Sequence, residues 1–264
     1  MNYNDIISAL PEEKPDFERY FAFSVHKSGS TMLGKMLRDV CKRCDLPGVS
    51  IPNFFFSEGV QAQDWKDDEK LAPVFNKNIL YYGFRFLPAV LKAPEVKLRD
   101  SRFVLLVRDP RDALVSQYFS YGKKSGSHAM PKKNAEAFIA AREATPERTI
   151  DEYVLHVSRP LRNKLMGYRD ALDFDKGLVR RYEDVFFDKQ TFLREIFEHF
   201  GIDVPANVIE KVAEKHDIRP DKEDESQHIR KGTPGDHKEK LAPETIATLN
   251  DTFREVATFY GYQL

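Results

Sequence analysis

The residues best suited to chemistry in this sequence form one short polar run, His26-Lys27-Ser28-Gly29-Ser30-Thr31. Gly29 lets the backbone turn tightly, and successive N–H groups at the start of a helix attract an anion. Ser30 and Thr31 add hydroxyl donors, and Lys27 adds a positive charge. The run indicates a phosphate-binding loop, although a plain turn from strand to helix with a Ser/Thr cap would use the same residues.

A second candidate for anion binding is Arg108, which ends an aliphatic stretch at 103–107. The loop is not a Walker A motif, because Lys27 precedes Gly29 instead of following a second glycine. A nucleoside triphosphatase usually ends a later strand with an Asp that holds Mg²⁺. An arginine at this place favours a phosphate bound without metal, and it disfavours an ATP-dependent phosphotransferase.

The elements that must position these residues alternate in type. Strands are predicted at 20–25, 79–82, 103–107 and 177–182, and apolar residues at helical spacing predict helices within 33–44, 192–200 and 246–260. A further helix is predicted to begin at Asp109-Pro110, with the Asp as cap and the Pro in the first turn. Such alternation is typical of an α/β fold with a central parallel sheet flanked by helices, which we expect to form one domain over 1–264.

The stretch from 217 to 240 differs from the rest of the chain, because Ile218 and Ile229 are its only aliphatic residues. It is too polar to belong to the core. A loop of this length in a compact domain is usually mobile or functional.

Composition excludes several classes of protein. The 264 residues include 41 Lys and Arg against 42 Asp and Glu, for a net charge of −1, and 41% are hydrophobic. A disordered chain would be poorer in apolar residues, and a nucleic-acid-binding protein would carry excess positive charge. Two cysteines cannot form a disulfide framework, and no apolar run is long enough to span a membrane. The polar N-terminal residues do not read as a signal peptide, so we expect a cytoplasmic protein.

Four segments in the same order resemble the sulfotransferases that use 3′-phosphoadenosine-5′-phosphosulfate (PAPS), most closely the cytosolic type. They are the Lys27 loop, the segment VRDPRDALVS with Arg108 and Ser116, the segment Tyr182-Glu183-Asp184, and the segment RKGTPGDHK that begins at Arg230. The resemblance implies a sulfotransferase fold with a P-loop-like phosphosulfate-binding loop. It also implies PAPS as the sulfuryl donor, no metal ion, and a small-molecule acceptor with a hydroxyl or amine.

The resemblance also implies a role for each part of the cofactor site. The loop would hold the 5′-phosphosulfate, Tyr182 would contact the adenine, and Met32 would cover the ring in place of the family's Trp. Residues 217–240 would form a lid that closes over the nucleotide. The residues expected to bind the cofactor are Lys27, Ser28, Gly29, Ser30, Thr31, Met32, Arg108, Ser116, Tyr182, Arg230, Lys231 and Gly232.

The sequence departs from the family at the general base, because Phe86 stands where the cytosolic enzymes have a His. Three side chains could replace it: Glu58, His26 and His128. We favour Glu58, since sulfotransferases of the Golgi and glycolipid kinds take a Glu base from about this region. Alternatively, the acceptor needs little help from a base, or the chain binds PAP (3′,5′-adenosine bisphosphate) or PAPS without transferring a sulfuryl group.

The acceptor is expected to lie beside aromatic residues that include Phe55 and Phe86. Arg85 differs from its aromatic neighbours in carrying a charge. It could pair with an anionic acceptor or with a structural carboxylate, and the sequence does not distinguish these two roles. The sequence does not predict an oligomeric state.

Overall fold

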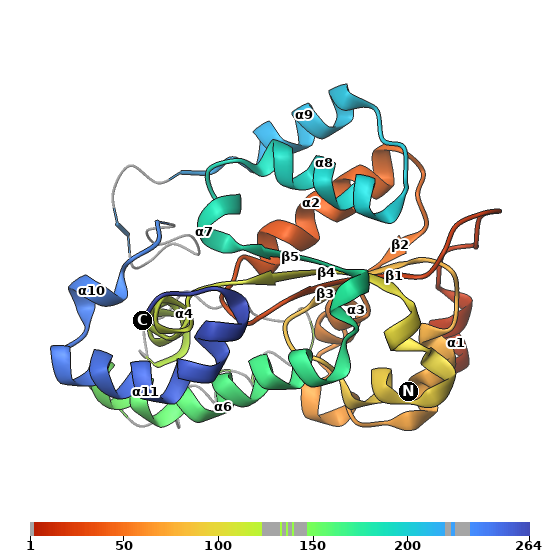
Figure 1. The fold of residues 1–264 in the computed structure, drawn as a ribbon. Coiled ribbons are helices and arrows are strands. Elements are labelled where there is room, and N and C mark those ends of the chain that lie inside the picture. The colour runs from red at the N-terminus through yellow and green to blue at the C-terminus, as the bar shows by residue number, and fades with distance from the viewer. Residues whose placement is uncertain are drawn as a thin grey trace.

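Five parallel strands form the centre of the computed structural model, which describes residues 3–122, 133, 136, 139, 147–219, 223–224 and 233–264 (Figure 1). The order across the sheet is β2-β3-β1-β4-β5. The parallel sheet expected from the sequence is therefore confirmed. The strands are β1 (Tyr20–Ser24), β2 (Gly48–Val49), β3 (Leu80–Phe84), β4 (Arg102–Val107) and β5 (Gly177–Arg181).

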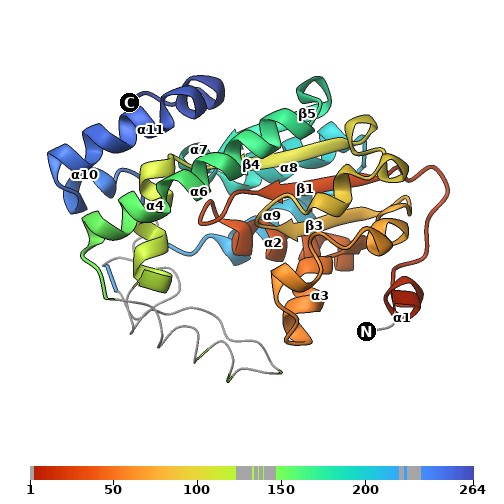
Figure 2. The ribbon, with the colours of Figure 1, turned by 90° about the horizontal axis from the view of Figure 1, so that it is seen from below.

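Helices cover both faces of this sheet. One face carries α2, α8 and α9, and the other carries α3, α4, α6 and α11, with α6 and α11 side by side in both views (Figures 1 and 2). The α-helices of the described residues are α1 (Tyr3–Ser8), α2 (Ser30–Arg43), α3 (Ile51–Ser57), α4 (Pro110–Gln117), α6 (Ile150–Ala171), α7 (Tyr182–Val185), α8 (Lys189–Phe200), α9 (Ala206–His216), α10 (His237–Lys240) and α11 (Pro243–Tyr260).

The strands separate two apolar cores because successive side chains of a strand point to opposite faces. In β1, Phe21 and Phe23 pack with residues of α6 and α11, such as Tyr168 and Phe253. Ala22 faces the other way, into the core built by α2, α8 and α9. Both faces of the sheet are thus buried, which explains the continuous apolar run in β4.

Two predicted boundaries shift in ways that matter for the site. The strand expected at 79–82 continues to Phe84, so that Arg85 follows its last residue directly. The strand expected to reach residue 182 ends at Arg181, and Tyr182 begins the short helix α7. Because all five strands are parallel, the residues that follow β1, β3, β4 and β5 lie at one edge of the sheet. Ligands of open α/β sheets bind at this carboxyl edge.

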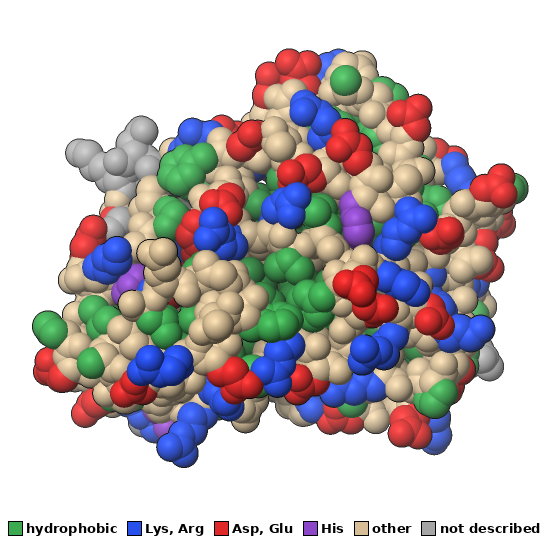
Figure 3. Space-filling view, in the orientation of Figure 1, with side chains coloured by type: hydrophobic (Ala, Val, Ile, Leu, Met, Phe, Trp, Pro, Cys, Tyr) green, Lys and Arg blue, Asp and Glu red, His purple; other side chains and the backbone are tan. Residues whose placement is uncertain are grey.

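The last strand of the sheet, β5, is only partly buried, and apolar side chains show between charged ones on this face (Figure 3). A groove of about 580 Å³ beside it is lined by Phe174, Val179, Arg180, Arg181, Asp184, Phe259, Tyr260 and Gly261. Arg180 pairs with Glu195, and Arg181 pairs with Asp184. Charged side chains on an edge strand oppose pairing with the strands of other chains.

Within the described part of the chain, no helix combines the length and the apolar character needed to cross a bilayer.

The close packing of β4 on β5 can be tested at Gly177, which pairs with Phe103. A Cβ at this position would lie 2.3 Å from the Phe103 ring, and that ring is 1% exposed. We expect Gly177→Ala to lower the free energy of unfolding by about 1–3 kcal/mol, because the ring has no room to move. Urea denaturation measures the change.

Gly167→Ala in α6 is the matched control, since among the described residues no atom outside the local helix backbone lies within 4 Å of its added Cβ. Ala is favoured over Gly inside a helix by roughly 0.5–1 kcal/mol, so this variant should gain stability. Equal stability of the two variants would contradict the close approach of Gly177 to Phe103.

Candidate functional site

The loop between β1 and α2 has the backbone of an anion-binding turn. Lys27 and Gly29 both adopt left-handed conformations, with φ of 65° and 87°. The N–H of Ser28 donates to the carbonyl oxygen of Val25 at 3.0 Å, which closes the turn just before α2 begins. Successive N–H groups next to a helix N-terminus form a positive concavity.

One side chain of the loop, that of Ser28, is buried with an unsatisfied polar group. Ser28 is fully buried, and its hydroxyl has no hydrogen-bond partner among the residues that the structure describes. Buried polar groups are nearly always satisfied by the protein, by water or by a ligand. The hydroxyl of Ser28 is therefore suited to bind an oxyanion held on the loop.

Lys27 directs its charge toward the helix that follows β4. Its ammonium group donates to the Ser120 hydroxyl at 2.6 Å, and Ser120 lies in the helical turn Tyr118–Gly122 after α4. This contact fixes the long side chain of Lys27 at the carboxyl edge of the sheet.

Arg108 supplies a second, buried cation beside the loop. It is 8% exposed, and one of its terminal nitrogens donates to the carbonyl oxygen of Lys27 at 3.3 Å. Its guanidinium lies 4.7 Å from the centre of the Tyr182 ring. Its Nε is buried without a hydrogen-bond partner in the described residues. A buried guanidinium with an unsatisfied donor is suited to bind an anion such as phosphate.

Tyr182 closes the site against the loop. The residue is 7% exposed, and a Cβ at position 29 would lie 3.0 Å from its ring and 3.4 Å from the side chain of Met32. Gly29 is therefore required both for its left-handed backbone and for the space that Tyr182 occupies. The structure thus brings together Lys27, Gly29, Met32, Arg108 and Tyr182, which lie far apart in the sequence.

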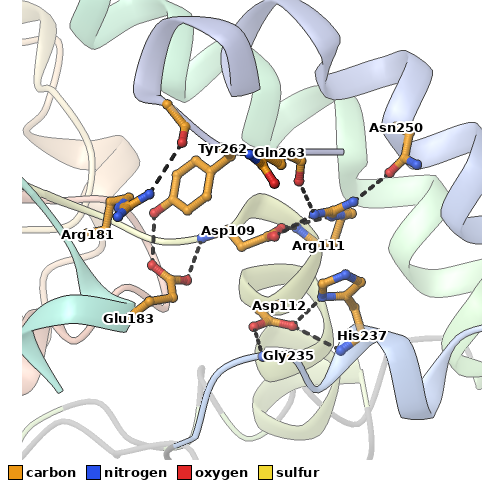
Figure 4. A network of polar contacts seen from close by, with 11 residues as sticks. Asp109, Arg111, Asp112, Arg181, Glu183, Gly235, His237, Asn250, Tyr262 and Gln263 are labelled. Atoms are coloured by element: carbon orange, nitrogen blue, oxygen red, sulfur yellow. Dashed lines mark hydrogen bonds and ion pairs between the residues drawn. The ribbon is translucent and has the colours of Figure 1, made fainter. Parts of the chain in front are cut away.

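A polar network holds the N-terminus of α4 directly after Arg108 (Figure 4). Asp109 caps the helix by accepting from the backbone N–H of Arg111 at 2.9 Å. The Arg111 side chain donates to both carboxylate oxygens of Asp109, at 3.0 and 2.7 Å. It also donates to Asn250 at 2.8 Å and to the carbonyl oxygen of Gln263 at 2.9 Å. The C-terminal residues thereby support the strand end that carries Arg108.

Glu183 joins the same network from the other side. Its carboxylate accepts from the N–H of Asp109 at 2.9 Å and from the Tyr262 hydroxyl at 3.0 Å. Burial raises the pKa of Glu183, against the opposing effect of these hydrogen bonds. Arg181 donates to the carbonyl oxygen of Gly261 at 3.3 Å. The residues on both sides of Tyr182 are thus held in place.

Asp112 is a residue of this site that the sequence analysis missed. Its carboxylate, fully buried, accepts from the N–H of Gly235 at 2.6 Å, from the N–H of His237 at 2.9 Å and from Nδ1 of His237 at 2.6 Å (Figure 4). Burial by itself raises the pKa of Asp112, but the His237 hydrogen bond and the charge of Arg108 outweigh it and lower the pKa to about 2. The only sequence signal is an Asp on the inward face of a helix. Its partners lie more than a hundred residues away.

The side chains expected near the acceptor fall in several environments. Nε2 of His26 lies 3.0 Å from the Tyr121 hydroxyl. Phe55 is 1% exposed and stacks on Trp65, so its ring belongs to the core. Phe86 also packs near Trp65, with 5.7 Å between the two ring centres.

Glu58 lies at the C-terminal end of α3. Its carboxylate forms an ion pair of 2.5 Å with Lys133, and the two side chains are 36% and 62% exposed.

Several predicted residues remain predictions. Ser116 lies partly buried on α4, and Ser30 and Thr31 lie in the first turn of α2; their contacts within the described part of the chain do not assign them a ligand. Arg230, Lys231, Gly232 and His128 lie outside the described residues, and the 217–240 segment is described only at 217–219, 223–224 and 233–240. Over the described residues, no three His, Cys, Asp or Glu side chains gather in a way that could hold a metal ion.

Comparison with known proteins identifies the family that this chain matches. A family model described as "Sulfotransferase domain" matches residues 18–261. The fold is similar to that of a mouse sulfotransferase, SULT7A1, complexed with PAP, with a TM-score of 0.58 and 17% identity over 96% of this chain and 88% of that chain. It is also similar to a sulfotransferase from Alicyclobacillus acidocaldarius, with a TM-score of 0.50 and 14% identity over 94% of this chain and 97% of that chain. No curated protein matches the sequence.

The role of Asp112 can be tested through the pH dependence of stability. Its pKa of about 2 lies below that of an Asp in an unfolded chain, so the carboxylate stabilises the fold above about pH 4. This contribution, about 2–3 kcal/mol, is lost as the pH falls through about 2. We expect Asp112→Asn to lower stability at pH 7 and to reduce the loss of stability between pH 4 and pH 2, both measured by denaturant unfolding.

Asp184→Asn serves as the control, because this carboxylate is 57% exposed in its ion pair with Arg181. Surface pairs of this kind contribute at most about 1 kcal/mol. A pH-independent difference between wild type and Asp112→Asn would contradict the buried contact.

Proposed function

Because the chain belongs to the sulfotransferase family, we propose that it transfers a sulfuryl group from PAPS to a hydroxyl or amine of a small molecule, leaving PAP. The observation that carries this proposal is Arg108, a buried cation with an unsatisfied donor beside the anion-binding loop. A donor with phosphate groups at its 5′ and 3′ positions needs cations at two separate places. The Lys27 loop and Arg108 supply them.

Different residues of the site bind different parts of the donor. The loop from Ser28 to Thr31 holds the 5′-phosphosulfate, and Arg108 with Ser116 holds the 3′-phosphate. Tyr182 and Met32, which meet at Gly29, enclose the adenine. The mouse sulfotransferase of similar fold was crystallised with PAP, which supports this donor. Arg230, Lys231 and Gly232 complete the 3′-phosphate site in this proposal, as part of a lid over 217–240.

For sulfuryl transfer, the protein mainly has to position the two substrates and to stabilise the charge that develops in the transition state. The acceptor oxygen or nitrogen forms a bond to sulfur while the bond from sulfur to the 5′-phosphate oxygen breaks. Lys27 neutralises the negative charge that gathers on that oxygen, and Ser28 and the loop N–H groups assist. The proton of the acceptor passes to a base.

His26 and Glu58 are the described candidates for this base. His26 directly precedes Lys27 in the loop proposed to hold the leaving oxygen. Glu58 is held by Lys133 in an exposed ion pair, so its carboxylate already has a partner. The sequence alone favoured Glu58, and these contacts lead us to place His26 first.

The donor site can be tested by thermal unfolding with PAP, using ADP and Mg-ATP as controls. PAP at about 100 times its dissociation constant should stabilise the protein by roughly 2.7 kcal/mol and raise Tm. Arg108→Gln should lose most of this shift. Lys27→Met should retain much of the shift and lose about 10²–10³-fold in turnover of labelled PAPS with a panel of phenols, alcohols and amines.

The alternatives predict different outcomes in the same experiment. A PAP-binding protein without transfer activity shows the PAP shift but no turnover in wild type. An ATP-dependent phosphotransferase shows a shift with Mg-ATP alone, and this result would overturn the proposed donor.

The base can be identified by comparing two conservative variants. We expect His26→Gln to lower kcat by about 10²-fold or more, because the acceptor proton loses its destination. Glu58→Gln should change kcat by less than about threefold, since it removes an exposed ion pair. Both variants should keep the PAP-induced shift in Tm, and the opposite order of kcat values would return the role to Glu58.

A further inference from the structure

The topology of the sheet leaves one side of the Lys27 loop for the acceptor. The strands β1, β4 and β5 carry the residues proposed to bind the nucleotide. On the opposite side of β1 lies β3. Arg85 directly follows β3, at the same carboxyl edge but away from Arg108. An inference about Arg85 rests on the proposed function, because it concerns the second substrate of the same site.

The register between the two strands places Arg85 next to the loop. Phe84 of β3 pairs with Phe23 of β1. The hydroxyl of Ser24 donates to the carbonyl oxygen of Phe84 at 3.2 Å. Arg85 therefore leaves the sheet beside the residues that lead into His26 and Lys27.

Arg85 is partly buried, and it makes no hydrogen bond or ion pair with any residue that the structure describes. Other arginines of similar burial are paired: Arg102 with Glu18, Arg162 with Glu255 and Arg180 with Glu195. A charge that loses water without gaining a partner is unfavourable. An anionic ligand would remove this cost.

Aromatic residues lie near Arg85, and one of them, Tyr121, links it to His26 at the reacting end of the site. Burial raises the pKa of Tyr121 to about 12, while the positive charge of Arg85 acts in the opposite direction, so the two groups lie near each other. The Tyr121 hydroxyl lies 3.0 Å from Nε2 of His26, the residue before Lys27. Phe86, which follows Arg85, packs near Trp65.

We propose that Arg85 binds an anionic group of the acceptor, most suitably a carboxylate, so that the acceptor class is that of hydroxy- or amino-bearing organic acids. The planar guanidinium donates two parallel hydrogen bonds to a carboxylate. The acceptor then lies with its anion on Arg85 and its nucleophilic oxygen or nitrogen toward His26 and Lys27. Tyr121 lies between these two ends.

The chain contains its own reporter for this site, because Trp65 is its single tryptophan and contacts Phe86. Fluorescence of Trp65 is followed while the PAP complex is titrated with 4-hydroxyphenylacetate or with its neutral amide, 4-hydroxyphenylacetamide. We expect wild type to bind the acid at least tenfold more tightly than the amide. Arg85→Met should abolish this preference, and Arg85→Lys should keep part of it.

Arg162→Met is the matched control. It removes an arginine of similar burial, on α6, that is paired with Glu255 of α11. It should keep the full preference for the acid. Equal affinity of wild type for acid and amide, failure to bind either, or a preference that persists in Arg85→Met would overturn the proposal. The PAP-induced shift in Tm is measured on each variant, so a failure of the donor site is seen separately.

Discussion

The structure of the candidate site depends on burying the charge of Arg108 at the end of β4. The guanidinium is 8% exposed, so water cannot solvate it fully. The protein stabilises it with the carbonyl oxygen of Lys27, the face of the Tyr182 ring and the negative charge of Asp112. These three groups come from the loop after β1, from α7 and from α4, and each is held by contacts of its own. The loop, the segment around Tyr182 and the start of α4 are thereby coupled through one cation.

Polar contacts from distant parts of the chain keep this arrangement rigid. Asp109 and Arg111 fix the first turn of α4, and the hydrogen bond from Tyr262 to Glu183 fixes the strand end beside it. Asp112 holds residues 235–237 against the same helix. These anchored residues belong to the segment 217–240 proposed to close over the nucleotide, and Asp112 lies one helical turn from Arg108.

Local sequence patterns predicted the parallel sheet and led to the proposed donor side of the site, but they did not reveal the contacts that support either. The aliphatic run of β4 and the polar loop at Lys27 are signals carried by neighbouring residues, so both were recognised. Asp112 and Tyr262 act through partners far along the chain, and no pattern of spacing reveals such pairs. The identity of the base stays a prediction: Phe86 stands at the position of the family's histidine, and the folded contacts pair Glu58 with Lys133 and place Nε2 of His26 3.0 Å from the Tyr121 hydroxyl.

The long-range character of these supports has a consequence for how the protein is made. During synthesis, α4 leaves the ribosome well before Asn250 and Gln263, the partners of Arg111. Until these residues are made, Arg111 lacks its contacts to Asn250 and Gln263. Closing a loop of this length is slow compared with pairing neighbouring elements. The contacts that hold Arg111 on α4 therefore form only after the C-terminal residues have docked.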